Sequence, residues 1–491
     1  MLEKHLFSYI FKSRQHPIKI FTYTTSGFWL LLIPLARKLY KLSFNVAEWF
    51  RGDWLDIIII SIIFGFAFLR WFFITFSIDK DCIKTGTGYF GLLKSMIDYN
   101  VICSVTCSQG PFYRFFGCYK VCIDTNANFI KRGHDVTLTL KKSDFKHLTN
   151  ILKEKNIGKV KYSYTPKKVH LIIFSLLFSS TLSGVILLST LMIQVSRIIG
   201  RQLEQKYLII VNDRIQNFLT INLPPIAIAA ASVIVIGWLY SLAVNLLRHW
   251  NFTTVRQGDS IIIKSGFITN RESVIMRDKI YSVDVRQNFF MRMFQICSVN
   301  IDCAGYGKGM RQIAVLLPVT TNKEVNNSLK ILLPDHVNPH NKLKSRFRDL
   351  TGFTTPPFLL CISIPVLAYI LWRIFPDWLV IIRFVAFIVE IPAFWLFVVK
   401  FASVFTTGIG FEEGYAVLNY CRLYQFHKVT IPANQITRID YYQTIFQKWS
   451  NNCSLRIYTY SETIKCHKIK NFPLKQAKTL LEKQGYHMEI K

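Results

Sequence analysis

Hydrophobic and polar positions divide the chain into six apolar runs separated by longer polar segments. A helix that crosses a membrane needs about 20 largely apolar residues, and all six runs come near that length. The runs lie in close pairs, so the pattern predicts six transmembrane helices grouped as three hairpins. The runs are Ile20–Ala36, Trp54–Phe76, Val169–Val195, Leu223–Leu247, Pro357–Ile374 and Trp378–Phe405.

The polar segment after each hairpin carries the same short motif. A glutamine is followed three positions later by an aromatic residue and five positions later by a cation, in QGPFYRFFG, QNFFMRMFQ and QTIFQKWSN. The matching residues are Gln109, Phe112 and Arg114, then Gln287, Phe290 and Arg292, then Gln443, Phe446 and Lys448. A pattern that recurs at long intervals indicates repeated structural units, so each hairpin and the segment after it form one copy.

Short alternating or apolar segments surround each motif and predict antiparallel strands joined by turns. In the second copy, SIIIKSGFITNRESVIMRDKIYSVDV gives three such strands. A helical stretch closes each copy, at Ser143–Lys155, Thr320–Leu333 and Pro473–Gln484. We therefore expect an α+β membrane protein in which each hairpin is followed by a small antiparallel barrel or curled sheet, capped by a C-terminal helix.

These elements define a plan of domains along the chain. We expect a basic N-terminal segment at 1–19, transmembrane hairpins at 20–76, 169–247 and 357–405, and sheet domains at 77–160, 248–345 and 406–487.

The Gly-containing turn, the apolar strand and the Q-x-x-F-x-[RK] segment resemble the bacterial PH-like domain family. The threefold arrangement with paired apolar runs is similar to the YdbT-type membrane proteins. The resemblance implies a PH-like fold for each sheet domain and a smaller, single-module membrane relative as a partner. Because the family has no established activity or agreed ligand, it implies no catalytic residues.

Composition and charge favour a membrane surface as the neighbour of this chain. Hydrophobic residues make up 51% of its 491 residues, yet the formal net charge is +31. Lys or Arg beside anionic headgroups gains about 1 kcal/mol each, so a bilayer with anionic lipids is the expected partner. Nucleic acid is not expected, because the basic residues gather beside the apolar runs and no recognition module appears.

The orientation follows from the basic residues near the spans. Lys and Arg are more frequent on the side that holds the N-terminus and the repeated domains, and such an excess marks the cytoplasmic side. Eleven scattered cysteines indicate a reducing compartment. We therefore expect a multi-pass protein of a bacterial cell membrane, with both termini and all PH-like domains in the cytoplasm.

Two pairs of cysteines have a spacing that suggests metal ligands, namely Cys103 with Cys107 and Cys118 with Cys122. Both pairs lie in strand-like sequence, where residues four apart are separated by about 13 Å. One zinc ion cannot readily span that distance, so we expect no metal and no other cofactor.

The repeated Gln motif allows two interpretations. In the structural one, Gln109, Gln287 and Gln443 hydrogen-bond the backbone of a turn and the cation reaches solvent. In the functional one, Arg114, Arg292 and Lys448 face lipid headgroups, since a guanidinium can donate two parallel hydrogen bonds to a phosphate. Phe112, Phe290 and Phe446 then dip toward the acyl chains.

Glu390 is the candidate polar residue inside the membrane, where an ionised carboxylate is costly. Arg383 lies two turns earlier on nearly the same helical face, too far for a direct ion pair. Arg70, near the end of the second span, is a candidate partner. A structural contact and a substrate or proton pathway both remain open for these residues.

No catalytic motif is recognisable: the chain lacks HExxH, GxSxG and a phosphate-binding GxxxxGK[ST] loop. We expect a non-enzymatic membrane scaffold that acts in cell-envelope maintenance or stress protection. The alternative is a transporter or lipid-handling protein that uses the six-helix bundle.

Overall fold

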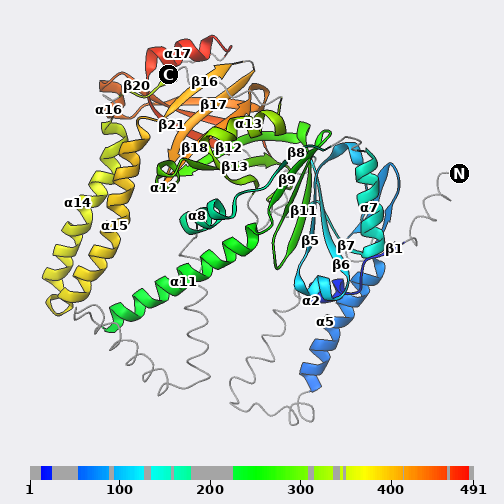
Figure 1. Ribbon diagram of the computed structural model, residues 1–491. Helices are drawn as coiled ribbons and strands as arrows, with labels where there is room; N and C mark the ends of the chain where they lie inside the picture. The colour runs from blue at the N-terminus through cyan, green and yellow to red at the C-terminus, as the bar shows by residue number, and fades with distance from the viewer. Residues whose placement is uncertain are drawn as a thin grey trace.

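The computed structural model describes most of the chain as three antiparallel sheet units that lie side by side in sequence order (Figure 1). The described residues are 13–24, 54–87, 93–126, 134–155, 160–178, 225–307, 314–334, 343–346, 350–412, 414–461 and 465–485.

The first unit begins with four strands and continues with three strands and a helix. Its elements are β1 (Ser13–Arg14), β2 (Thr75–Ile78), β3 (Cys82–Thr87), β4 (Leu93–Asp98), β5 (Ile102–Gln109), the one-turn helix α6 (Pro111–Phe115), β6 (Cys118–Thr125), β7 (Val136–Lys141) and α7 (Lys142–Lys155). Helices α2 (Lys19–Thr24) and α5 (Trp54–Phe73) lie between β1 and β2.

The second unit repeats this order. Its elements are β8 (Val160–Tyr164), β9 (Thr253–Gln257), β10 (Ser260–Ser265), β11 (Asn270–Met276), β12 (Ile280–Asn288), α12 (Phe289–Met293), β13 (Ile296–Cys303), β14 (Val315–Thr321) and α13 (Asn322–Leu332). Helices α8 (Lys168–Phe178) and α11 (Pro225–His249) lie between β8 and β9.

The third unit has the same plan. Its elements are β15 (Leu343–Lys344), β16 (Gly408–Glu412), β17 (Tyr415–Arg422), β18 (Gln425–Pro432), β19 (Ile436–Tyr442), α16 (Ile445–Trp449), β20 (Asn452–Thr459), β21 (Lys465–Pro473) and α17 (Leu474–Glu482). Helices α14 (Thr351–Ile374) and α15 (Leu379–Ser403) lie between β15 and β16. The closing helix predicted for each copy is present as α7, α13 and α17.

Each unit starts before its apolar helices. The short strands β1, β8 and β15 pair with the first strand after the helices, as in Ser13 opposite Phe76 and Leu343 opposite Ile409. The helices are therefore inserted between the first two strands of a sheet, and this ties each of them to the unit at both ends.

The sheets continue from one unit into the next. β5 of the first unit pairs with β11 of the second, and β12 of the second unit pairs with β18 of the third. Two seven-stranded sheets result, in the orders β7-β6-β5-β11-β10-β9-β8 and β14-β13-β12-β18-β17-β16-β15. Neighbouring units thus share a sheet through backbone hydrogen bonds, which the expectation of separate barrels did not include.

Each unit keeps its own hydrophobic core, since alternate strand residues face inward. Ile83 and Leu140 are buried in the first unit, Ile261 and Val299 in the second, and clusters of mainly aliphatic residues surround them. The third core includes Phe411 and Phe472, packed against Leu481 of α17. The closing helix covers its sheet because the apolar face of the helix has nowhere else to be buried.

The prediction of six transmembrane helices is wrong. Within the described part of the chain, only two helical segments are long and apolar enough to cross a bilayer, Thr351–Ile374 and Ile382–Ser403. The apolar part of α5, Ile60–Phe73, is shorter, and only α8, an 11-residue helix, is described from the third run. Much of the runs at Ile20–Ala36 and Val169–Val195 lies outside the described residues. Outside the six predicted runs, most of the described secondary structure is strand.

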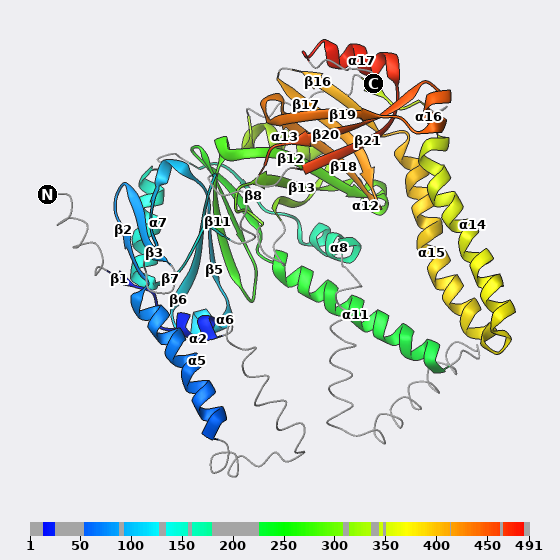
Figure 2. The ribbon, with the colours of Figure 1, turned by 180° about the vertical axis from the view of Figure 1, so that it is seen from behind.

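The α14–α15 pair is an exposed apolar hairpin. Only 6% and 11% of its two candidate spans are buried by protein. Both helices leave the third unit on the side toward which α5 and α11 also extend from their own units (Figures 1 and 2). An apolar surface of this size is unfavourable in water, so this side of the molecule is the one suited to lipid.

Candidate functional site

The repeated glutamine forms the same hydrogen bond in every unit. Its side-chain amide donates to the backbone carbonyl nine residues later, at the start of the next strand: Gln109 to Cys118 at 3.3 Å, Gln287 to Ile296 at 2.9 Å and Gln443 to Asn452 at 2.6 Å. The residue before each acceptor has a positive φ, of 64° at Gly117, 53° at Gln295 and 51° at Asn451. The glutamine therefore closes a turn built around a short helix.

The hydrogen bond from Gln443 predicts how much stability the chain loses when this glutamine is replaced. In Gln443→Leu the carbonyl of Asn452 loses its donor, and an unsatisfied polar group of this kind costs about 1 to 3 kcal/mol. We expect the free energy of unfolding of the full chain in detergent to fall by about that amount. Gln484→Leu, at an exposed position after α17, is the matched control and should change little. An unchanged stability in Gln443→Leu would contradict the structural role.

The one-turn helices α6, α12 and α16 carry a group of exposed apolar side chains. These are Phe112, Phe115 and the following Phe116 at the first, Phe290, Met293 and the following Phe294 at the second, and Trp449 at the third. The structure places Arg114, Arg292 and Lys448 at the surface beside them. Phe446 lies in α16, and its side chain is outside the described part.

In the second unit the side chains of the motif contact the third unit. The Arg292 guanidinium lies 4.6 Å above the ring of Phe426 in the third unit. Phe290 stacks on Trp395 of α15, with ring centroids 4.9 Å apart. The motif of the second unit thus touches the apolar hairpin, and two of its predicted functional residues take part in joining units.

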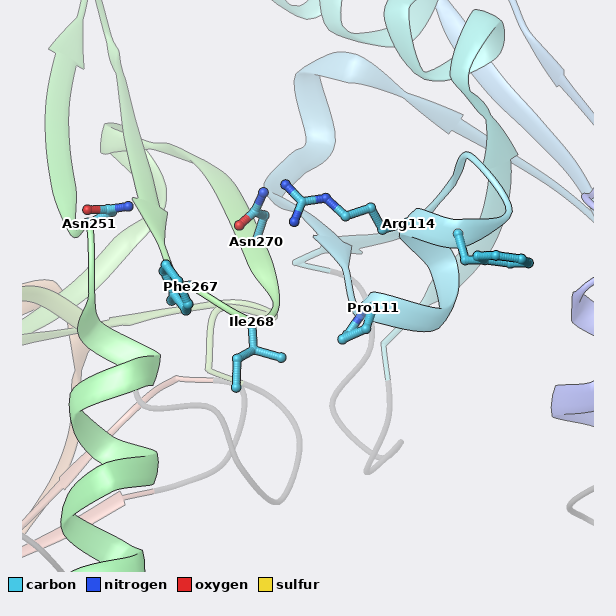
Figure 3. A pocket seen from close by; sticks show the side chains of 8 residues that line it. Pro111, Arg114, Asn251, Phe267, Ile268 and Asn270 are labelled. Carbon is cyan, nitrogen blue, oxygen red and sulfur yellow. The ribbon is translucent and has the colours of Figure 1, made fainter.

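The corresponding place after the first unit is an open pocket of about 680 Å³. Pro111, Arg114 and Phe115 line it from the first unit, and Phe267, Ile268 and Asn270 from the β10–β11 turn of the second. Arg114 and Asn270 point toward one another across the pocket (Figure 3). Phe267 and Ile268 are exposed, so the pocket combines the guanidinium of Arg114 and the amide of Asn270 with an apolar rim.

A larger cleft of about 1450 Å³ lies between the second and third units, at the base of the α14–α15 hairpin. One wall is apolar and comes from the hairpin, and the remainder is polar and strongly basic. The apolar wall contains Phe353, Pro356, Pro357, Leu360 and Leu396; the cations are Arg286, Lys400, Arg422, Lys465, Lys468 and Lys470.

Polar side chains that line this cleft form hydrogen bonds with one another. His427 Nδ1 and Arg286 Nε lie 3.1 Å and 2.6 Å from Asp284 Oδ2. Burial alone would raise the pKa of Asp284, but the hydrogen bond from His427 and the charge of Arg286 hold that pKa below its usual value. The Tyr420 hydroxyl lies 3.0 Å from His467 Nδ1, and burial lowers the pKa of His467 to about 4. His467 is therefore neutral at physiological pH.

Three lysines of the cleft remain without an ion pair in the described part of the chain. Lys400 donates to the carbonyl of Cys421 at 2.9 Å. Burial lowers the pKa of Lys470, and the charges of Lys400 and Lys468 lower it further. The charges of Lys400 and Lys468 therefore oppose that of Lys470, and an anion between the three ammonium groups would relieve this repulsion. We call Lys400, Lys468 and Lys470 the lysine cluster.

The motif and the shared sheets can now be set beside known proteins. A model of the bacterial PH domain matches residues 30–156 and 210–330, together about half of the chain. The chain belongs to the bacterial PH domain family. The matched ranges fall on the first two PH units, and the third repeats their strand order, Gln turn and closing helix.

A curated relative of this PH-domain protein is the UPF0699 transmembrane protein YdbT of Bacillus subtilis (strain 168). The two are 24% identical over 136 residues, which is 27% of this chain and 28% of the relative. The match therefore spans little more than a quarter of the relative's length. No solved structure matches the chain. The relative and the exposed α14–α15 hairpin support a membrane-associated PH-domain protein.

The three residues predicted to lie inside the membrane, Glu390, Arg383 and Arg70, do not form one site. Glu390 is in α15, half-buried, and its Oε2 atom is buried without a hydrogen bond in the described part. The carboxylate interacts with the Cys361 thiol of α14. Arg383 is exposed. Arg70 lies 4.4 Å above the ring of Tyr23, on α5 at the opposite end of the molecule (Figure 1). The structure does not bring Arg70 to Glu390.

Sequence reasoning missed the lysine cluster. A signal was present in the basic segment KCHKIK (465–470), which forms part of β21, and in Lys400 near the end of an apolar run. Neither segment indicates by itself that the other lies near it, because strand β21 and helix α15 are brought together only by the third PH unit.

Proposed function

We propose that this protein is a non-enzymatic membrane scaffold that holds anionic lipid headgroups in the cleft between its second and third PH units. The α14–α15 hairpin anchors it, and the PH units lie on the cytoplasmic face of a bacterial cell membrane. In this role it serves envelope maintenance or stress protection, together with a smaller, single-module relative. The observation that carries the proposal is the lysine cluster beside the apolar hairpin.

The cleft combines the two surfaces that a phospholipid presents. The lysine cluster supplies unneutralised positive charge at the base of α15, where a headgroup phosphate would lie. Phe353, Pro357 and Leu360 of α14 supply an apolar wall next to it, which suits the start of an acyl chain. Lysine is a point-charge donor to phosphate, and charge-assisted hydrogen bonds are about twice as strong as neutral ones.

The joined sheets supply the scaffold part of the proposal. Loose domains on linkers would move independently, whereas units that share a sheet through a ladder of hydrogen bonds keep one relative orientation. The cleft also favours a second role, lipid handling, because a ligand held between two units and a hairpin can enter from the membrane side.

Replacing two of the three lysines tests the cleft. We expect Lys468→Gln/Lys470→Gln to weaken binding of a short-chain phosphatidylglycerol to the full chain in non-ionic detergent by roughly 100-fold, because two charge-assisted contacts of about 1.5 kcal/mol each are lost. Titration followed by native mass spectrometry measures this, with phosphatidylcholine and inorganic phosphate as parallel ligands.

Lys475→Gln/Lys483→Gln, on the exposed face of α17 and beyond, changes the net charge equally and should leave phosphatidylglycerol binding intact. Equal losses in both double variants would show that charge acts non-specifically and would contradict the proposed site. If inorganic phosphate bound as tightly as the lipid, the apolar wall would contribute nothing to affinity, and this part of the proposal would be contradicted.

A further inference from the structure

Successive PH units are joined by one recurring pairing of strands. The fifth strand of one unit pairs with the fourth strand of the next, β5 with β11 and β12 with β18. The register is the same at both junctions. Val105 lies opposite Val274 in the first, and Val283 lies opposite Thr430 in the second; Val105 and Val283 are equivalent positions, four residues before the repeated glutamine.

At the two ends of the array the equivalent strands are sheet edges. β4, the fourth strand of the first unit, ends the sheet β1-β2-β3-β4, and β19, the fifth strand of the third unit, ends the sheet β19-β20-β21. Within the described ranges no strand lies against the outer side of either. A sheet edge exposes backbone donors and acceptors that can pair with another chain.

The side chains of β4 are exposed where their counterparts are buried. Ser95 is exposed, whereas the equivalent Ser273 and Val429 are 5% and 1% exposed at the two junctions. Met96 is 69% exposed, and its counterpart Thr430 is 7% exposed. Exposed Met96 is the type of apolar edge residue that a partner strand would cover.

We propose that β19 of one copy of this protein pairs with β4 of a second copy, in the register already used twice within the chain. Ile439 then lies opposite Met96, and Asp440 opposite Ser95. Met96 packs over the core of the third unit beside Ile439, which is partly buried against that core. Asp440 and Ser95 face each other as Thr106 and Ser273 do at the first junction, where their hydroxyls lie 3.1 Å apart.

A second copy fits these edges for two reasons. The chain carries both halves of the junction, and their registers correspond residue for residue. The first and third units lie at opposite ends of the molecule (Figures 1 and 2), so β19 does not reach β4 of its own chain. The pairing is therefore head-to-tail between copies, which generates a ring or an open row.

The direction of the helices is compatible with such an assembly. α5, α11 and the α14–α15 hairpin extend to the same side of the array (Figure 1), although two junctions separate the first unit from the third. A further junction of the same kind keeps the hairpin of the next copy on that side. The assembly can thus grow along a membrane surface.

Cysteine cross-linking in native membranes tests the proposal. Two differently tagged chains are co-expressed, one with Ser95→Cys and the other with Asp440→Cys, both with Cys466→Ser to remove an exposed native thiol. Directly opposite residues on paired strands have Cβ atoms about 5 Å apart, so we expect mild oxidation to give a doubly tagged product at twice the chain mass. Met96→Cys with Ile439→Cys is a second pair in the same register.

The matched control combines Met96→Cys with Asp440→Cys, whose side chains would lie on opposite faces of the joined sheet and should not cross-link. Cross-linking of Ser95→Cys chains with one another would show symmetric edge pairing and overturn the head-to-tail arrangement. Absence of the product for both in-register pairs, or a product between Asp440→Cys and a smaller single-module protein in place of the second copy, would also overturn the proposal.

Discussion

Gly305→Ala is expected to lower the free energy of unfolding by roughly 3 kcal/mol or more, because it combines a strained backbone with a steric overlap. Gly305 has a φ of 77°, a conformation that disfavours any side chain. A Cβ atom at this position would overlap the side chain of Asp124. Asp124 belongs to β6 of the first PH unit and is fully buried, so neither partner can move away without separating two units.

The control for this prediction is Gly414→Ala. Gly414 has a similar φ of 75°, but nothing lies within 4 Å of its ideal Cβ position. In this variant only the backbone conformation is unfavourable, at a cost of about 1 to 2 kcal/mol. Chemical unfolding of both variants in detergent gives the comparison. If the two variants lose equal stability, the contact between Gly305 and Asp124 does not hold the first two units together.

Raising the pH from about 6 to about 10 is expected to remove about 3 kcal/mol of stability through one ion pair. His134 Nδ1 lies 2.6 Å from Oδ2 of buried Asp124. Burial alone would lower the pKa of His134, but the hydrogen bond and charge of Asp124, with a contribution from Cys122, raise it from 6.5 to about 9.

The raised pKa of His134 determines how stability changes with pH. The folded state holds the His134 proton more tightly than the unfolded state, so the stabilisation is complete below pH 6.5 and is lost as the pH rises through about 9. Unfolding free energies measured across this range test it. His134→Gln should remove this part of the pH dependence, whereas His147→Gln, at an exposed position on α7, should retain it. Parallel pH profiles for the native chain and His134→Gln would contradict the assignment.

The repeated motif was the most informative part of the sequence. Its three copies located β5, β12 and β19 and the strands that follow, although the segment between them was predicted as a turn and contains a one-turn helix in each unit. The hydrogen bonds from Gln109, Gln287 and Gln443 explain why this residue recurs: each amide reaches a carbonyl at a fixed distance along the chain. Local contacts of this kind depend on neighbouring residues, which is why a single sequence can reveal them.

Hydropathy was less informative about the membrane. The run at Trp54–Phe76 is largely apolar, but its last residues form β2, and Phe76 is buried in the core of the first PH unit. Apolar residues suit a protein core and a bilayer equally well. Hydropathy alone therefore placed the end of α5 and the start of β2 in a single predicted span. The exposure of α14 and α15 outside the PH units is what distinguishes the lipid-facing hairpin.

The sequence by itself determined that three related α+β units follow one another and where their strands, turns and closing helices lie, because period, turn residues and repeated motifs are local properties. The tertiary structure decided which strands meet. Val105 and Val283 are buried strand residues that pair with the next unit, but alternation along a sequence cannot tell whether the neighbouring strand belongs to the same unit or the next. That choice joined the sheets and left β4 and β19 as the edges of the array. Packing within the third unit placed Lys400 of α15 beside Lys468 and Lys470 of β21, since contacts between distant segments depend on how whole units pack.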